Sequence, residues 1–172
     1  MKTIREQIIE RMVTQLESIT TANGYHNNIG PGHVYRQQSV TEQEHNHCIS
    51  IWELSESRKR NRYGGTERIL TLKIEAIVEV DKNKHPATVS NELLGDIETA
   101  LILYDTTMDE LIDDIQDVMA EIIQLPVNKK LTSLNSEIIP LPVERKLAGA
   151  SIDFEIKYTT EWGDPYTAGQ AT

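Results

Sequence analysis

The chain has 172 residues, with 27 acidic and 17 basic side chains and a formal net charge of −10. That length suits one domain with its own core, while the acidic balance argues against a general nucleic-acid binder or a protein lying on an anionic membrane. The single cysteine, Cys48, excludes a disulfide within the chain and fits a reducing cytosol. No apolar run approaches the roughly 20 residues of a membrane span, and the first ten residues mix charges with apolar positions, unlike a signal peptide.

The first predicted element is an amphipathic helix from Lys2 to about Ala22. Its apolar residues recur at helical spacing, at Ile4, Ile8, Ile9, Met12, Val13, Leu16 and Ile19. Asn23-Gly24 supplies the stop, because glycine tolerates the left-handed conformation that follows a helix end. A loop rich in Asn and Gly then runs from His26 to Gly32.

The next predicted elements are strands. A short one covers His33 to Gln38 and a longer one covers Cys48 to Glu56, after a polar connection. The segment Ser57–Thr66 reads as a hairpin tip with Gly64-Gly65 in its turn. The central strand follows over Glu67–Asp81, because alternate residues there are apolar: Leu70, Leu72, Ile74, Ala76, Val78 and Val80.

Two helical runs are predicted after the central strand. The first covers Thr88–Tyr104, capped by Ser90 or Thr88, with a buried stripe of Leu93, Leu94, Ile97, Leu101 and Tyr104. The second opens at the capping-box spacing of Thr107 and Glu110 and runs to about Gln124. An alternative is one helix kinked near Asp105. The acidic side of the second run carries Asp109, Glu110, Asp113, Asp114, Asp117 and Glu121.

The remainder of the chain ends in one more strand. Asn128–Arg145 reads as irregular, and Leu147–Tyr158 alternates with Ala148, Ala150, Ile152, Phe154, Ile156 and Tyr158 inward. The predicted fold class is therefore α+β: a mainly antiparallel sheet with a long hairpin, packed by an N-terminal helix and a central helix pair. We expect one domain over residues 1–160 and a polar C-terminal tail over 161–172 that is loose at its end.

No motif in the sequence supports an enzyme or a cofactor site. His45-Asn46-His47-Cys48 contains zinc-ligand types, but His26, His33 and His85 stand alone in the sequence, so a second ligand pair is missing and a solvated loop is the alternative. The glycines of Asn28–His33 lack the Lys-Ser/Thr of a phosphate loop. There is no Gly-x-Ser-x-Gly and no dinucleotide fingerprint.

Two charged segments are candidate protein-interaction sites. Arg58, Lys59, Arg60, Arg62 and Tyr63 form the one dense basic patch, on the predicted hairpin tip. A protein contact with an acidic neighbour is the favoured interpretation, and a solvated loop or a nucleic-acid patch are the alternatives. The second segment is acidic and comprises Asp109, Asp113, Asp117 and Glu121 on the predicted helix. A solvated helix face is the favoured interpretation of these carboxylates, and a partner or lumen surface, a metal site or an acid/base site are the alternatives.

The order of elements carries a resemblance. A helix ending in Gly24-Tyr25 precedes a strand region with a long hairpin and a helix containing Asp96-Ile97-Glu98-Thr99-Ala100-Leu101. The chain ends with Phe154-Glu155-Ile156-Lys157-Tyr158 and Gly163-Asp164-Pro165-Tyr166. This arrangement resembles the tail-terminator (minor tail, tail-completion) proteins of long-tailed bacteriophages.

The resemblance implies a compact protomer that assembles in the host cytoplasm as a ring, usually a hexamer, at the head-proximal end of the virion tail. Such a ring caps the tail tube, ends its polymerisation and joins the neck or connector, with the sheath as a further partner where a tail has one. DNA passes through the lumen without specific binding, and no membrane is involved. We expect the basic tip of one copy to meet the acidic face of another. The alternatives are another phage neck or tail-completion component, a cytosolic protein-binding adaptor, and a metal-dependent hydrolase using the carboxylates.

Overall fold

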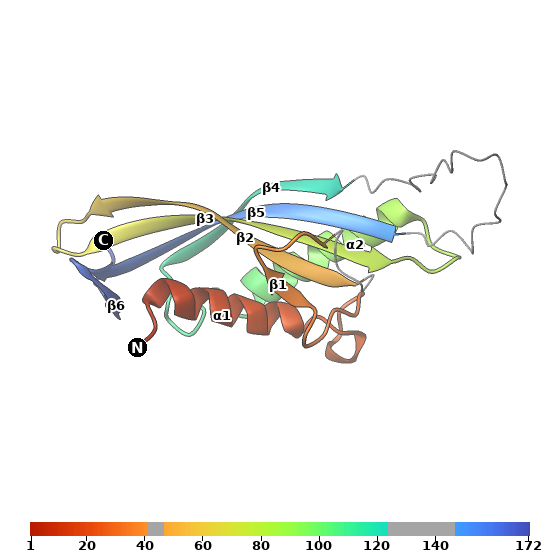
Figure 1. Cartoon of the computed structure of the whole chain (residues 1–172), viewed down its shortest axis with the longest axis horizontal. Coiled ribbons are helices and arrows are strands. Elements are labelled where there is room, and N and C mark those ends of the chain that lie inside the picture. Colours follow the sequence, from red (N-terminus) through yellow and green to blue (C-terminus); the bar gives the residue numbers. More distant parts are fainter. Residues whose placement is uncertain (41–46, 124–146) are drawn as a thin grey trace, which may run out of the picture.

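The computed structural model describes residues 1–40, 47–123 and 147–172. Its helices are α1 (Ile4–Glu17) and α2 (Pro86–Glu98), with a short 3-10 turn at Thr21–Asn23 and a π-helical turn at Thr99–Leu103 that continues α2. Its strands are β1 (Val34–Arg36), β2 (Cys48–Arg60), β3 (Thr66–Glu79), β4 (Asp114–Ile123), β5 (Leu147–Glu161) and β6 (Asp164–Ala168). Figure 1 shows both α-helices beneath one face of a long, twisted sheet.

The described strands form one six-stranded sheet in the order β1-β2-β3-β5-β4, and β6 pairs with β5. Among the described strand pairs, only β1 and β2 run parallel, and the others are antiparallel. The β2–β3 hairpin turns at Asn61–Gly65, where Gly64 takes a φ of +89° that glycine adopts without a steric penalty. The coarse prediction of an α+β protein with a mainly antiparallel sheet and a long hairpin is confirmed.

The core lies between the helices and the covered face of β3 and β5. Alternate residues of both strands are buried there, as their period of two predicts: Leu70, Leu72, Ile74, Ala76 and Val78 from β3, and Ala148, Ala150, Ile152, Phe154, Ile156 and Tyr158 from β5. The stripe of α1 is buried from Ile4 to Leu16, and Ile19 just beyond it is buried too. The two central strands therefore agree with the predictions. The first helix is also found, but it ends at Glu17 rather than near Ala22, and Gly24 closes the 3-10 turn that follows.

The second helical run, predicted for Thr107–Gln124, is wrong for its described residues, and so is the single kinked helix. Met108, Asp109 and Glu110 have φ values of 48°, 58° and 64°, which no right-handed helix contains. The chain then enters β4, which pairs with β5 from Asp114 to Ile123. Its apolar spacing fits a helix, but hydrogen bonding along the long edge of β5 decides the conformation. The helix cover is thus α1 and α2, not α1 with a helix pair.

The ends of α2 also differ from the predictions. Its N-cap is His85, whose Nδ1 accepts a hydrogen bond from the backbone N–H of Ala87, with Pro86 in the first turn. Ser90 is buried inside the helix rather than capping it. Tyr104 is 69% exposed and touches Tyr25 only edge-on, so it does not extend the buried stripe.

The predicted hairpin tip and tail are more regular than expected. Arg58, Lys59 and Arg60 belong to strand β2, which pairs with β3 up to Arg60 and Thr66. Residues 164–168 form β6, and Asn61 Nδ2 donates to the backbone carbonyl of Gln170, so much of the polar tail is held against the sheet. Predictions for His45, Asn46 and Asn128–Arg145 lie outside the described residues.

Two glycines give a test of this fold. A Cβ on Gly65 would lie 2.9 Å from the backbone carbonyl of Thr160, whereas a Cβ on Gly95, within α2, would meet nothing within 4 Å. We expect Gly65→Ala to lower the free energy of unfolding by about 1–3 kcal/mol and Gly95→Ala to raise it by about 0.5–1 kcal/mol. Urea denaturation measures both, and equal effects of the two changes would contradict this packing.

Candidate functional site

The β2–β3 and β5–β6 hairpins project together beyond the N-terminal end of α1, at the left of Figure 1. A β-bulge at Leu54 precedes this end of β2, because Glu53 pairs with Leu72 and Ser55 pairs with Thr71. The extra residue leaves both Glu53 and Glu56 on the helix-covered face. Directly paired residues share a face, and Glu53 and Glu56 pair with the buried Leu72 and Leu70. The apolar core therefore passes into a charged layer at this end.

Glu56 is the centre of that layer, and its side chain is only 4% exposed. Its carboxylate accepts hydrogen bonds from the Tyr158 hydroxyl at 2.5 Å, Arg58 Nε at 2.6 Å and Arg68 Nη1 at 3.1 Å. Arg5 Nη1 from α1 lies 3.7 Å away. Burial alone would raise the pKa of Glu56, but these hydrogen bonds outweigh it and lower that pKa below its usual value. The carboxylate stays ionised and fixes two arginines on the projecting end.

A second set of ion pairs ties α1 to the start of the projecting end. Glu53 accepts hydrogen bonds from Arg5 Nη2 at 3.0 Å and from Arg36 Nη2 at 2.6 Å. Arg36 also reaches Glu6 on α1, at 2.6 Å from Nη1, and this pairing lowers the pKa of Glu6. The projecting end is thus held to the helix layer by side chains far apart in the sequence.

Basic and aromatic side chains cover the outer part of this end. The Arg60 guanidinium lies 4.2 Å from the ring centre of Trp162, and the Arg62 guanidinium lies 4.9 Å from that of Tyr63. Trp162 is 65% exposed despite that contact. We call this surface the basic–aromatic end, formed by Arg58, Lys59, Arg60, Arg62, Tyr63 and Trp162. The structure thus keeps the five predicted basic-patch residues together and adds Trp162, which lies in the predicted polar tail and was not among the predicted site residues.

The four predicted acidic residues are not brought onto one helix face. Asp109 lies in the turn before β4 and pairs with Arg11 at 3.2 Å, and Asp113 accepts a hydrogen bond from the Thr159 hydroxyl at 2.6 Å. Asp117 pairs in register with the buried Phe154, so it lies on the helix side of the sheet, whereas Glu121 pairs with Ser151 on the other side. Asp109 and Asp113 are therefore engaged within the chain.

Strand β4 carries apolar side chains among its carboxylates and is an edge of the sheet. Val118 is 56% exposed, Met119 54% and Ile122 46%. Next to it, Glu98 of α2 lies close to Asp117: burial, the charge of Asp117 and hydrogen bonding to it all raise the pKa of Glu98. We call Asp114–Ile123, with its mixed carboxylate and apolar side chains, the β4 edge.

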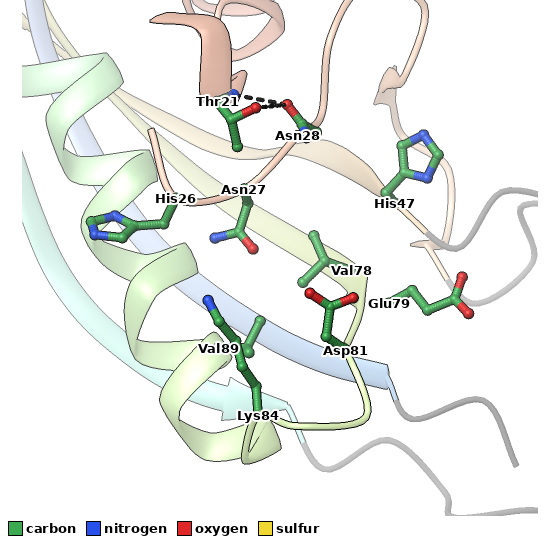
Figure 2. A pocket seen from close by; sticks show the side chains of 10 residues that line it. All are labelled: Thr21, His26, Asn27, Asn28, His47, Val78, Glu79, Asp81, Lys84 and Val89. Carbon is green, nitrogen blue, oxygen red and sulfur yellow. Dashed lines mark hydrogen bonds between the residues drawn. The ribbon is translucent and has the colours of Figure 1, made fainter. Parts of the chain in front are cut away.

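A separate pocket of about 340 Å³ lies between the loop after α1 and the chain joining β3 to α2. Figure 2 shows His47 on one side of it and Asp81 and Lys84 on another, with Asn27 between. Beneath the loop, the buried Asp96 of α2 accepts hydrogen bonds from the backbone N–H groups of His26 and Asn27. Lys84 pairs with Glu92 at 3.2 Å. Among the described residues that line this pocket, Thr21 donates its hydroxyl to the side-chain oxygen of Asn28 rather than to a base.

Metal binding and thiol chemistry find no support in the part of the chain that the structure describes. Among residues 1–40, 47–123 and 147–172 there is no group of three or more His, Cys, Asp or Glu side chains placed to hold a metal ion. Burial raises the pKa of the Cys48 thiol to about 11, which disfavours the reactive thiolate. None of the described helices has the length and apolar character needed to cross a bilayer.

Comparison with known proteins adds no identification. No protein-family model matches the chain, and no curated protein matches its sequence. The described residues define its class by themselves: an α+β protein whose sheet is covered by helices on one face. Its candidate site is a pair of interaction surfaces, the basic–aromatic end and the β4 edge.

Proposed function

We propose that this protein is a structural component of a bacteriophage tail that assembles as a ring, caps the tail tube and joins it to the neck of the head. The observation that carries the proposal is the basic–aromatic end, where exposed Arg60 and Trp162 project beyond the helix-covered core. Arginine and the aromatic residues dominate the energetics of protein interfaces. Together with the order of elements, this surface favours a protein that acts by binding other subunits.

The two surfaces suit a ring because they differ from each other. A contact between unlike faces repeats around an axis, and it closes into a ring when the rotation is right. The basic–aromatic end offers cations, and the β4 edge offers Asp114, Asp117 and Glu121. The net charge of −10 also suits a lumen through which DNA slides, because like charges repel. Partners are then the tail-tube protein, the neck or connector and further copies of the chain.

Charge reversal at the basic–aromatic end tests the role of this surface. We expect Lys59→Glu combined with Arg60→Glu to weaken self-association at least tenfold, which corresponds to about 1.4 kcal/mol. Arg58 is left unchanged because it also bonds the buried Glu56. Light scattering measures the association, and the matched control is Lys2→Glu with Lys82→Glu, two exposed lysines elsewhere. Unchanged ring formation and unchanged joining of tails to heads would remove the proposed role of the basic–aromatic end.

Imaging of particles that lack the protein tests the function itself. A terminator predicts tails of uncontrolled length or finished tails that do not join heads. Tails of normal length on complete particles would contradict the proposal. Heads and tails that join normally, with a defect elsewhere in the neck, would favour another tail-completion component.

A further inference from the structure

Besides the outer edges of the short strands β1 and β6, two longer stretches of the sheet have an edge that no described strand pairs. The outer edge of β4 is one, because β4 ends the strand order. The second is the end of β2 from Leu54 to Arg60, because β1 covers β2 only at Ile49–Ile51. The backbone N–H of Glu53 still donates a hydrogen bond to the side chain of Gln37. From Leu54 to Arg60, this edge of β2 makes no backbone hydrogen bond to another described segment. The two free edges lie on opposite sides of the same sheet.

The β4 edge is unusual for a free strand. Natural proteins protect a long exposed edge with proline, lysine or a short length, because unpaired N–H and C=O groups invite another strand. β4 has 10 residues, no proline and no lysine, and Val118, Met119 and Ile122 are about half exposed. A bulge at Val118 and the carboxylates are its only protection among the described residues. These features fit a strand that is covered in an assembly.

We propose that the β4 edge of one copy pairs with the Leu54–Arg60 edge of β2 in the next copy, so that the sheet continues from subunit to subunit. This inference rests on the proposed ring-forming function and names the contact that builds the ring. The occupant of the β4 edge is thus a second copy of this chain, bound by main-chain hydrogen bonds and side-chain charge.

Strand direction permits this pairing. β2, β3, β5 and β4 are each antiparallel to the next in the sheet, so β2 and β4 run in opposite directions. In a ring, every copy has the same orientation relative to the axis. The β4 strand of one copy therefore meets the β2 strand of its neighbour antiparallel, which is the more stable of the two ladders per residue.

Charge selects this contact over pairing between like edges. The free part of β2 carries Arg58, Lys59 and Arg60, and its one carboxylate, Glu56, is buried and paired with arginines, whereas β4 carries Asp114, Asp117 and Glu121. Opposite charges across a strand pair stabilise it, and like charges directly opposite destabilise it. Two β4 edges would place carboxylates together, and two β2 edges would place cations together. The exposed Leu54 also offers an apolar side chain to Val118 and Met119.

Cross-linking of the full-length protein tests the contact. Ser57 and Gln116 are both exposed. Ser57 pairs with Ile69 and Gln116 pairs with Glu155, and both partners lie on the sheet face away from the helices. We expect Ser57→Cys and Gln116→Cys in one chain, treated with a short bismaleimide, to give a ladder of covalent oligomers. A mixture of the two single variants should give a dimer containing one of each, and neither variant alone should cross-link. Ser57→Cys with Thr14→Cys, exposed on α1, is the matched control, and the buried Cys48 supplies an unreactive background.

A charge swap gives an independent readout. In the register that brings Ser57 opposite Gln116, Lys59 comes opposite Asp114, and both lie on the face of the sheet away from the helices. We expect Lys59→Glu or Asp114→Lys alone to weaken self-association about threefold or more, and the double variant to return within about twofold of the unmodified protein.

Each outcome decides the inference. A ladder with rescue by the charge swap supports it. Normal rings without the Ser57–Gln116 cross-link overturn the edge pairing and leave the ring proposal standing. Cross-linking of Gln116→Cys alone overturns it in favour of a symmetric β4 contact. A protein that stays monomeric overturns it as well, and the imaging of tails then decides the proposed function separately.

Discussion

Replacing Glu56 with alanine is expected to lower the free energy of unfolding by about 3–5 kcal/mol, the loss typical of removing one partner from a buried ion pair. The change leaves Arg68 and the Tyr158 hydroxyl without the carboxylate that they bond, and the Arg68 side chain is only 10% exposed. Urea denaturation at pH 7 measures the loss. The matched control is Glu10→Ala, an exposed carboxylate paired with Lys2, for which about 0–1 kcal/mol is expected.

A second substitution, Glu56→Gln, tests how the charge of Glu56 makes stability depend on pH. The folded-state pKa of Glu56 is lowered, so its stabilising contribution is fully present above the unfolded pKa, near 4.5, and is lost as pH falls through the folded pKa. We expect the difference in unfolding free energy between the unmodified protein and Glu56→Gln to shrink below about pH 4.5. A difference that stays constant from pH 7 to pH 3 would show that the Glu56 charge does not contribute.

Elements with an unambiguous apolar period were predictable from the sequence. In β3 and β5 apolar residues alternate with others over most of the strand, a period of two that a helix does not give. In α1 the apolar residues recur at helical spacing. β4 was not predictable in this way, because Ile115, Val118, Met119 and Ile122 also fit a helix. The strand forms because it can pair with the edge of β5, a contact that the local sequence pattern does not show.

The interaction surfaces could be predicted only in part. The dense basic segment from Arg58 to Arg62 could be recognised in the sequence. That its first residues belong to a strand follows only from how far β2 extends. The bulge at Leu54 has no proline or glycine to mark it, so the alignment of Glu53 and Glu56 on one face could not be anticipated. Trp162 joins Arg60 only because β6 folds back on β5. The Arg60–Trp162 contact joins residues 102 positions apart, and the bulge depends on the pairing of β2 with β3 rather than on a local motif.

Asp96→Ala is expected to lower the free energy of unfolding by about 3–4 kcal/mol, because hydrogen bonds to a buried charged group contribute about 1.5–3 kcal/mol each and are not additive. The Asp96 side chain is 3% exposed. Its Oδ1 accepts from the His26 N–H and contacts His26 Nδ1, both at 3.1 Å, and its Oδ2 accepts from the N–H of Asn27 at 2.9 Å and from Asn27 Nδ2 at 2.8 Å. This one carboxylate therefore fixes the loop after α1 onto α2, across about 70 residues of chain.

Two further variants separate the charge of Asp96 from its shape. Asp96→Asn keeps the volume but replaces one acceptor oxygen with a donor, which faces the donors of Asn27 or His26, so a loss of about 2–3 kcal/mol is expected. Glu92→Ala, on the same helix and paired with Lys84 near the surface, should cost about 0–1 kcal/mol. Hydrogen exchange adds a local readout: amides of residues 25–30 should lose protection in Asp96→Ala well before those of β3. Equal protection of this loop in Asp96→Ala and the unmodified protein would mean that α1 and the sheet, rather than Asp96, hold it in place.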